Sequence, residues 1–198
     1  MGKFIVFEGM DRSGKSTTLK MLGDYLRNNR SFNVNEVTTD TIIGNYIPSL
    51  ISYTPDEIVY MLFWQAIREI DICKVKPILE KDASIVLCDR HFLSNIAYDW
   101  WSDLDIDFKQ KVDDLYLNYC TKPDLLFLFT IPYSTFLERD DYDTIFNQSL
   151  FESIQQGYLA LAEELSDKDI CNIVLVDGSL PQDQVFDIVL NKVEEVLD

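Results

Sequence analysis

The residues best suited to chemistry lie near the start of the chain, where positions 9–16 read Gly-Met-Asp-Arg-Ser-Gly-Lys-Ser. Gly9 and Gly14 permit backbone angles that are closed to other residues, so successive N–H groups can point at one anion. Lys15 can reach the terminal phosphates of a nucleotide, and the Ser16 hydroxyl is a suitable ligand for Mg²⁺. The spacing therefore predicts a phosphate-binding loop for a nucleoside triphosphate.

A second set of reactive residues, Asp89-Arg90-His91, follows the apolar run at 85–88. A carboxylate at the carboxyl end of an inner parallel strand lies close to such a loop, where it can hold Mg²⁺ or its water shell. Arg90 offers a fork of donors suited to a phosphate. The alternative is a surface ion pair that closes the strand. We expect His91, the single histidine, to be structural.

Strands and helices must position both sets of residues, and the sequence supplies these elements in alternation. Continuous apolar runs predict strands at residues 3–8, 34–38, 84–88, 125–130 and 172–176. Helical periodicity covers residues 15–29, 55–81, 93–120 with a break near 103–105, 133–139, 147–165 and 181–197. The alternation predicts an α/β fold, a three-layer αβα arrangement around a five-stranded parallel sheet. Ligands then bind at the carboxyl ends of the strands.

The composition limits the classes of function and location. The chain has 198 residues, 47% of them apolar, and nothing marks a linker, so we expect one domain over residues 1–198. A formal net charge of −17 argues against a general nucleic-acid binder and gives each cation near a loop more weight. The four cysteines form no CxxC pair and indicate a reducing, cytoplasmic location. No apolar run approaches the ~20 residues of a membrane helix, so we expect no membrane partner.

Two longer segments contain the residues described above. Positions 7–17 read Phe-Glu-Gly-Met-Asp-Arg-Ser-Gly-Lys-Ser-Thr, and positions 89–98 read Asp-Arg-His-Phe-Leu-Ser-Asn-Ile-Ala-Tyr. Together they resemble the thymidylate kinase family. Many NTPases share the first pattern, whereas the second is far more specific. Further similarity at 41–44, 122–128, 151–162 and 176–179 extends the resemblance over essentially the whole chain.

The resemblance implies a P-loop NTPase fold of the nucleoside monophosphate kinase type, with a short lid around residues 138–146. It implies ATP-dependent phosphorylation of dTMP to dTDP, with Mg²⁺ as cofactor, ATP and dTMP as small-molecule partners, and a homodimer. The implied catalytic residues are Arg12, Lys15, Asp89 and Arg90. The implied metal ligands are Ser16 and Asp89.

The resemblance also implies which residues bind the donor nucleotide. Asp11, although it lies in the loop, is expected to accept a hydrogen bond from the 3′-hydroxyl of the acceptor sugar. Arg12 is expected to neutralise charge on the transferring group. The residues implied in ATP binding are Gly9, Asp11, Arg12, Ser13, Gly14, Lys15, Ser16, Thr17, Arg139, Asp177 and Gly178.

The acceptor pocket is expected to use an aromatic residue and an arginine on one helix. Trp64 and Arg68 are four residues apart and share a helix face, although Phe63 is an equally good aromatic by composition. The alternative is a core aromatic beside a surface arginine. Arg68 could donate to the carbonyl at position 4 of thymine. The residues implied in dTMP binding are Asp11, Phe63, Trp64, Arg68, Arg90, Ser94, Tyr98, Tyr142 and Gln148.

The chain departs from the family in two places. Family members usually carry an arginine after the second strand, whereas residues 36–41 here contain no cation. The lid is short and Arg139 is the one arginine near it, so Arg139 could match either the family's adenine-stacking arginine or another arginine of its lid. Two alternatives therefore stay open. The first is a deoxynucleoside kinase, for which Glu36 could supply the carboxylate base after the second strand, or a deoxynucleotide kinase of other or broader base specificity. The second is a low-turnover nucleotide-binding scaffold.

Overall fold

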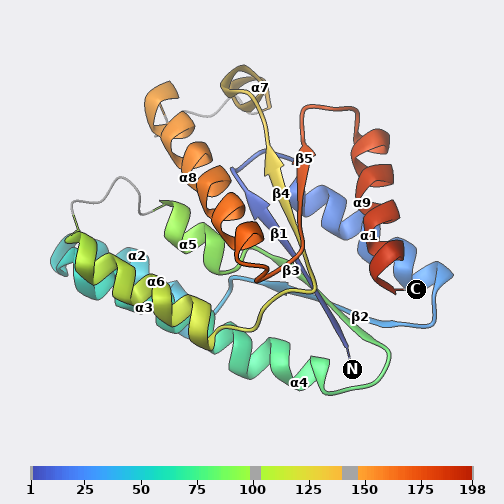
Figure 1. Cartoon of the computed structure of the whole chain (residues 1–198), viewed down its shortest axis with the longest axis horizontal. Coiled ribbons are helices and arrows are strands. Elements are labelled where there is room, and N and C mark those ends of the chain that lie inside the picture. The colour runs from blue at the N-terminus through green and yellow to red at the C-terminus, as the bar shows by residue number, and fades with distance from the viewer. Residues whose placement is uncertain (1, 99–103, 140–146, 198) are drawn as a thin grey trace.

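The sheet forms the middle layer of the molecule (Figure 1). The computed structural model describes residues 2–98, 104–139 and 147–197. Its strands are β1 (Lys3–Gly9), β2 (Asn33–Thr38), β3 (Ser84–Asp89), β4 (Leu125–Thr130) and β5 (Ile173–Asp177). They pair in the order β2-β3-β1-β4-β5, and each neighbouring pair is parallel. The predicted five-stranded parallel sheet is therefore confirmed, with strand ends within one residue of those predicted.

Helices cover both faces of the sheet, which confirms the three-layer αβα prediction. On one face, α1 (Lys15–Asn29) and α9 (Gln182–Leu197) share an apolar cluster with Ile5 and Phe7 of β1. On the other face, Phe4 and Val6 join a cluster with α5 (Phe92–Tyr98) and α8 (Gln148–Asp167). Because β1 alternates between two buried faces, its sequence is apolar almost throughout.

The predicted helix at 55–81 is interrupted in its second half. It consists of α3 (Asp56–Ile70), the π-helical turn η2 (Asp71–Val75) and α4 (Lys76–Leu79). The predicted pattern at 93–120 comprises α5 and α6 (Ile106–Tyr119), and residues between them lie outside the described part. The predicted helix at 133–139 corresponds to α7 (Tyr133–Glu138).

One helix falls outside the predicted helical ranges. It is α2 (Ile42–Leu50), which continues into the 3-10 turn η1 (Ile51–Tyr53). Thr41 caps it by accepting from the Gly44 N–H at 2.8 Å, and both carboxylate oxygens of Glu69 accept from its first backbone amides. Glu69 belongs to α3, so this cap depends on tertiary contact and gives little local signal.

No helix in the described ranges is long and apolar enough to span a bilayer.

Candidate active site

The loop between β1 and α1 has the geometry of an anion cradle. Gly9 and Gly14 have φ angles of 124° and 95°, which only glycine adopts without strain, and Arg12 also lies in the left-handed region at 62°. A Cβ on Gly9 would collide with the backbone oxygen of Phe129 in β4. The glycine spacing thus serves both the loop conformation and the close approach of two strands.

A cavity of about 650 Å³ opens over this loop, and we call it the loop cavity. Of the residues implied in ATP binding, Gly9 and Asp177 are not among the described residues that line it, although Gly178 beside Asp177 is. Asp89 and Arg90 line it as well, so the second reactive segment meets the first. The implied nucleotide-binding residues that line it are Asp11, Arg12, Ser13, Gly14, Lys15, Ser16, Thr17, Arg139 and Gly178.

Lys15 is held in place at the floor of the loop cavity. Its ammonium donates to the Met10 carbonyl at 2.7 Å, and the residue is only 5% exposed. Burial, with repulsion from Arg90, lowers the pKa of Lys15 to about 8, while the carboxylates of Asp89 and Asp11 oppose this shift. The group is therefore still largely protonated at neutral pH, so the loop cavity carries a buried positive charge.

Ser16 and Asp89 together provide oxygen ligands of the kind that Mg²⁺ prefers. The Ser16 hydroxyl donates to Asp89 Oδ2, and both residues line the loop cavity beside Lys15. Parallel pairing places Asp89 opposite Phe7, at the end of β3 nearest the loop. A hydroxyl and a carboxylate at a phosphate cradle fit a cation that takes its other ligands from phosphate oxygens and water.

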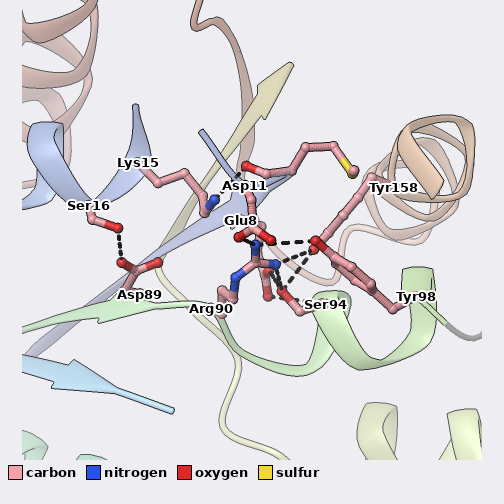
Figure 2. Close-up of polar contacts among 10 residues, drawn as sticks. Glu8, Asp11, Lys15, Ser16, Asp89, Arg90, Ser94, Tyr98 and Tyr158 are labelled. Atoms are coloured by element: carbon pink, nitrogen blue, oxygen red, sulfur yellow. Dashed lines mark hydrogen bonds and ion pairs between the residues drawn. The ribbon is translucent and has the colours of Figure 1, made fainter. Parts of the chain in front are cut away.

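Arg90 is the centre of a polar network that the sequence could not show (Figure 2). Its Nη2 donates to Asp11 at 2.5 Å and to the Tyr98 hydroxyl at 3.4 Å. Its Nη1 donates to Ser94 Oγ and to the Tyr158 hydroxyl, both at 3.0 Å. Burial alone would lower the pKa of Arg90, but the surrounding tyrosine and acidic groups hold it well above its usual value. The guanidinium is thus permanently charged and fixed from two sides.

Glu8 and Tyr158 belong to this network, and the sequence reasoning assigned neither a role. Glu8 is fully buried, and burial raises the pKa of its carboxyl group although hydrogen bonds from Ser94 and His91 oppose the rise. The available signal for Glu8 was an acidic residue at the end of an apolar strand, since such residues are rarely buried without partners. Tyr158 gave no local signal, because it is one of many apolar and aromatic residues on the buried side of α8, which also carries Phe151.

A second cavity of about 690 Å³ lies among α2, α3 and α5, and we call it the helix cavity. Most of its wall is apolar, with Tyr60 and Phe63 from α3, and Ser94 and Tyr98 line its polar end. The described residues that line both cavities are Thr38, Thr39 and Arg90. The two cavities therefore meet at the carboxyl ends of β2 and β3, and Arg90 is the cation shared by the described walls of both.

The expected aromatic and arginine pair is placed differently from the prediction. Neither Trp64 nor Arg68 is among the described residues that line the helix cavity, whereas Phe63 is. Trp64 packs against the apolar cluster that contains Phe4 and Val6 of β1. It points away from the direction of Phe63 because neighbouring helical positions point about 100° apart. Arg68 donates to the Tyr119 carbonyl and lies 3.5 Å from the buried Asp71 carboxylate. Trp64 is thus packed as in the core-aromatic alternative and Arg68 has partners outside the helix cavity, while their roles toward a bound base stay predictions.

Arg12 and Arg139 both line the loop cavity. Arg139 donates to the carbonyls of Arg12 at 2.8 Å and Gly178 at 2.6 Å, so it joins the loop to the turn after β5. Arg12 donates to the Phe136 carbonyl at 3.2 Å, and its guanidinium carbon lies 4.4 Å from the Phe136 ring centre. Within the cavity wall, Arg12 therefore lies beside α7 and Arg139 beside the turn after β5.

The remaining candidate residues lie away from the two cavities or outside the described part. Gln148 donates to Glu152 at 2.8 Å and is absent from the described walls of both cavities. Tyr142 lies outside the described residues, as does most of the implied lid. Glu36 forms an ion pair with Arg27 at 2.6 Å on the α1 side of β2. That pairing leaves the deoxynucleoside kinase alternative without its suggested carboxylate base.

The chain was compared with known proteins. The family model described as "Thymidylate kinase" matches residues 7–188. A "Probable thymidylate kinase" of Methanococcus maripaludis is 33% identical over 98% of this chain and 96% of its own length. A "Thymidylate kinase" of Sulfurihydrogenibium sp. is 30% identical over 98% of both chains. A "Probable thymidylate kinase" of Thermococcus kodakarensis is 31% identical over 85% of this chain and 88% of its own length. The matches extend over nearly the whole length of the chain, which carries the loop cavity and the helix cavity on one parallel sheet with Arg90 in both walls. This chain therefore belongs to the thymidylate kinase family.

Proposed function

We propose that this enzyme transfers the terminal phosphoryl group of ATP to the phosphate of dTMP, forming ADP and dTDP. The observation that carries the proposal is the junction of the two cavities at Arg90, because a donor in one and an acceptor in the other then meet phosphate to phosphate. The family resemblance supplies the identity of the nucleotides, and Glu36 paired with Arg27 speaks against a nucleoside acceptor.

The donor triphosphate lies in the loop cavity in this proposal. Backbone amides of the loop and the start of α1 bind its phosphates, and Lys15 contacts the terminal ones. Ser16 and Asp89 would hold Mg²⁺, which would supply positive charge to neutralise the phosphates. Arg139, placed between the loop and Gly178, borders the side on which the adenine would lie.

The acceptor lies in the helix cavity, with its base toward α3 and its phosphate toward Arg90. Phe63, the aromatic that lines the cavity, stacks on the thymine in place of Trp64. Asp11 accepts from the sugar hydroxyl, while Ser94 and Tyr98 border the sugar and phosphate. Since Arg90 already contacts Asp11 at 2.5 Å, the acceptor would bind across an existing ion pair.

Catalysis then consists of positioning and charge neutralisation. The acceptor phosphate oxygen is already an anion, so the nucleophile needs no general base. Lys15 and Arg90 bring the two phosphates together despite their repulsion, and Arg12 stabilises the negative charge of the transferring group. We propose that a short lid around residues 138–146 excludes water from the phosphoryl group during transfer.

A coupled ADP-release assay tests the proposed substrate. The rate is measured with dTMP, dUMP, dCMP, dGMP and thymidine as acceptors, each with ATP and Mg²⁺. We expect the highest kcat/KM with dTMP and a strict requirement for the acceptor phosphate. Activity with thymidine and none with dTMP would overturn the proposal in favour of a nucleoside kinase, and negligible turnover with every acceptor would favour the scaffold alternative.

We also propose that the enzyme is a homodimer. The structure exposes large apolar side chains along α2, η1 and α3, including Ile42 at 72%, Tyr46 at 65% and Ile51 at 51% exposure. Large apolar side chains exposed on consecutive elements of this kind are typical of a protein interface. Analytical ultracentrifugation should give twice the 23.0 kDa chain mass, and Tyr46→Glu should shift the species to the monomer. A wild-type monomer at micromolar concentration would contradict the assignment.

A further inference from the structure

We propose that Glu8, Ser94 and Tyr158 form a buried anchor that holds the Arg90 guanidinium in the orientation in which it binds the acceptor phosphate. The inference rests on the function proposed above. It makes Glu8 and Tyr158 positioning residues, which act through Arg90 without touching a substrate.

Glu8 fixes the backbone that carries Arg90. Its Oε1 accepts from the backbone N–H of His91 at 2.7 Å and from that of Ser94 at 3.3 Å. Its Oε2 accepts from the Ser94 hydroxyl at 2.5 Å. The carboxylate in β1 thereby ties down the segment that directly follows Arg90. This matters because Arg90 has a φ of 70°, a backbone conformation that a non-glycine residue keeps only when its surroundings enforce it.

Tyr158 closes the network from the opposite side. It projects from α8, and its hydroxyl lies 2.8 Å from Ser94 Oγ and 3.0 Å from Arg90 Nη1 (Figure 2). One guanidinium nitrogen is thus held by two hydroxyls, while the other faces Asp11 and Tyr98 at the cavity junction. The first nitrogen fixes the side chain, and the second is presented to the acceptor.

The donors around Glu8 set the direction of the hydrogen bonds in this network. The backbone N–H groups of His91 and Ser94 can only donate, and both donate to Oε1, while the Ser94 hydroxyl gives its single proton to Oε2. The lone pairs of the Ser94 oxygen then accept from Arg90 and from Tyr158, and the Tyr158 oxygen accepts from Arg90. A glutamine at position 8 replaces one of the two acceptor oxygens with an NH₂ donor, so this order would no longer be enforced.

A fixed guanidinium binds a phosphate better than a mobile one. Arginine otherwise loses much side-chain freedom when it orders on a ligand, and an anchored side chain has lost that freedom in advance. The advantage applies only to the phosphate, because Arg90 has no role in reading the base. Loss of the anchor should therefore weaken dTMP binding and leave thymidine binding nearly unchanged.

The test compares dTMP and thymidine binding by calorimetry in wild type, Glu8→Gln and Tyr158→Phe. We expect both variants to bind dTMP about tenfold more weakly, which corresponds to part of one charge-assisted hydrogen bond, and to bind thymidine within about twofold of wild type. In steady-state assays the same variants should raise KM for dTMP while KM for ATP stays within about twofold. Glu8→Asp keeps both carboxyl oxygens as acceptors and should recover part of the dTMP affinity.

Tyr116→Phe serves as the matched control, because it removes a fully buried tyrosine hydroxyl that contacts Asn95 instead of Arg90. It should change the affinities for dTMP and thymidine by the same factor. Should Glu8→Gln fail to fold, Tyr158→Phe carries the test, since its ring keeps the core packing. Folded variants that lose dTMP and thymidine affinity equally would overturn the anchor. A wild-type enzyme that binds thymidine but not dTMP would instead overturn the proposed function.

Discussion

The loop cavity and the helix cavity differ in how they are built. One short segment, residues 9–18, supplies nearly half of the described residues that line the loop cavity, and its glycines set the backbone shape. The helix cavity collects side chains from β2, α2, α3 and α5, which tertiary packing brings together. The individual residues of a site encoded in one segment can therefore be predicted from the sequence. For a site assembled from several elements, the sequence predicts only the general location.

The largest expected effect falls in the loop cavity. Lys15→Ala removes the buried ammonium that we propose contacts the terminal phosphates, and we expect kcat/KM for ATP to fall by about 10²- to 10³-fold. A coupled ADP-release assay gives the value, and circular dichroism verifies the fold. Retention of full activity would mean that the loop does not bind the donor, so the loop cavity could not be assigned as the donor site.

Arg12→Ala separates catalysis from binding in the same cavity. The side chain lies over Phe136 at the cavity mouth, and its proposed partner is the transferring group. We expect kcat to fall by about 10²-fold while KM for ATP changes less than threefold. Equal kcat in the variant would remove Arg12 from the mechanism and leave Arg139 as the candidate cation.

Phe63 and Trp64 test the helix cavity, where the sequence and the structure differ. Phe63→Ala should raise KM for dTMP about tenfold, since a base–aromatic stack contributes roughly 1–3 kcal/mol. Trp64→Phe should leave KM for dTMP within about twofold and lower the melting temperature, because Trp64 packs in the core. The reverse pattern would show that the base lies against Trp64 and that the cavity rearranges on binding.

The smallest effect is expected from Arg68. Its guanidinium is already engaged by the Tyr119 carbonyl and Asp71, so Arg68→Gln should change the ratio of kcat/KM for dTMP over dCMP by less than about twofold. A residue that donated to the thymine carbonyl would contribute about tenfold or more to that ratio. A large loss of discrimination would therefore place Arg68 at the base after all.

Much of the fold could be predicted because the strands are buried on both faces and read as continuous apolar runs. The loop residues and the Ser16–Asp89 pair could be predicted for a similar reason, since a phosphate loop and the end of a neighbouring strand must meet at one edge of a parallel sheet. The rest could not, because it depends on long-range contacts. Glu69 capping α2, the rotation that turns Phe63 instead of Trp64 toward the cavity, and Tyr158 reaching Arg90 from α8 all join distant elements.

In the proposed reaction the donor and acceptor phosphates meet at Arg90. A crystal structure of the enzyme with dTMP and a non-hydrolysable ATP analogue would show whether they do. We predict the analogue in the loop cavity, the dTMP phosphate within hydrogen-bond distance of the Arg90 guanidinium, and the thymine against Phe63. A dTMP molecule bound outside the helix cavity, or with its phosphate remote from Arg90, would rule this arrangement out.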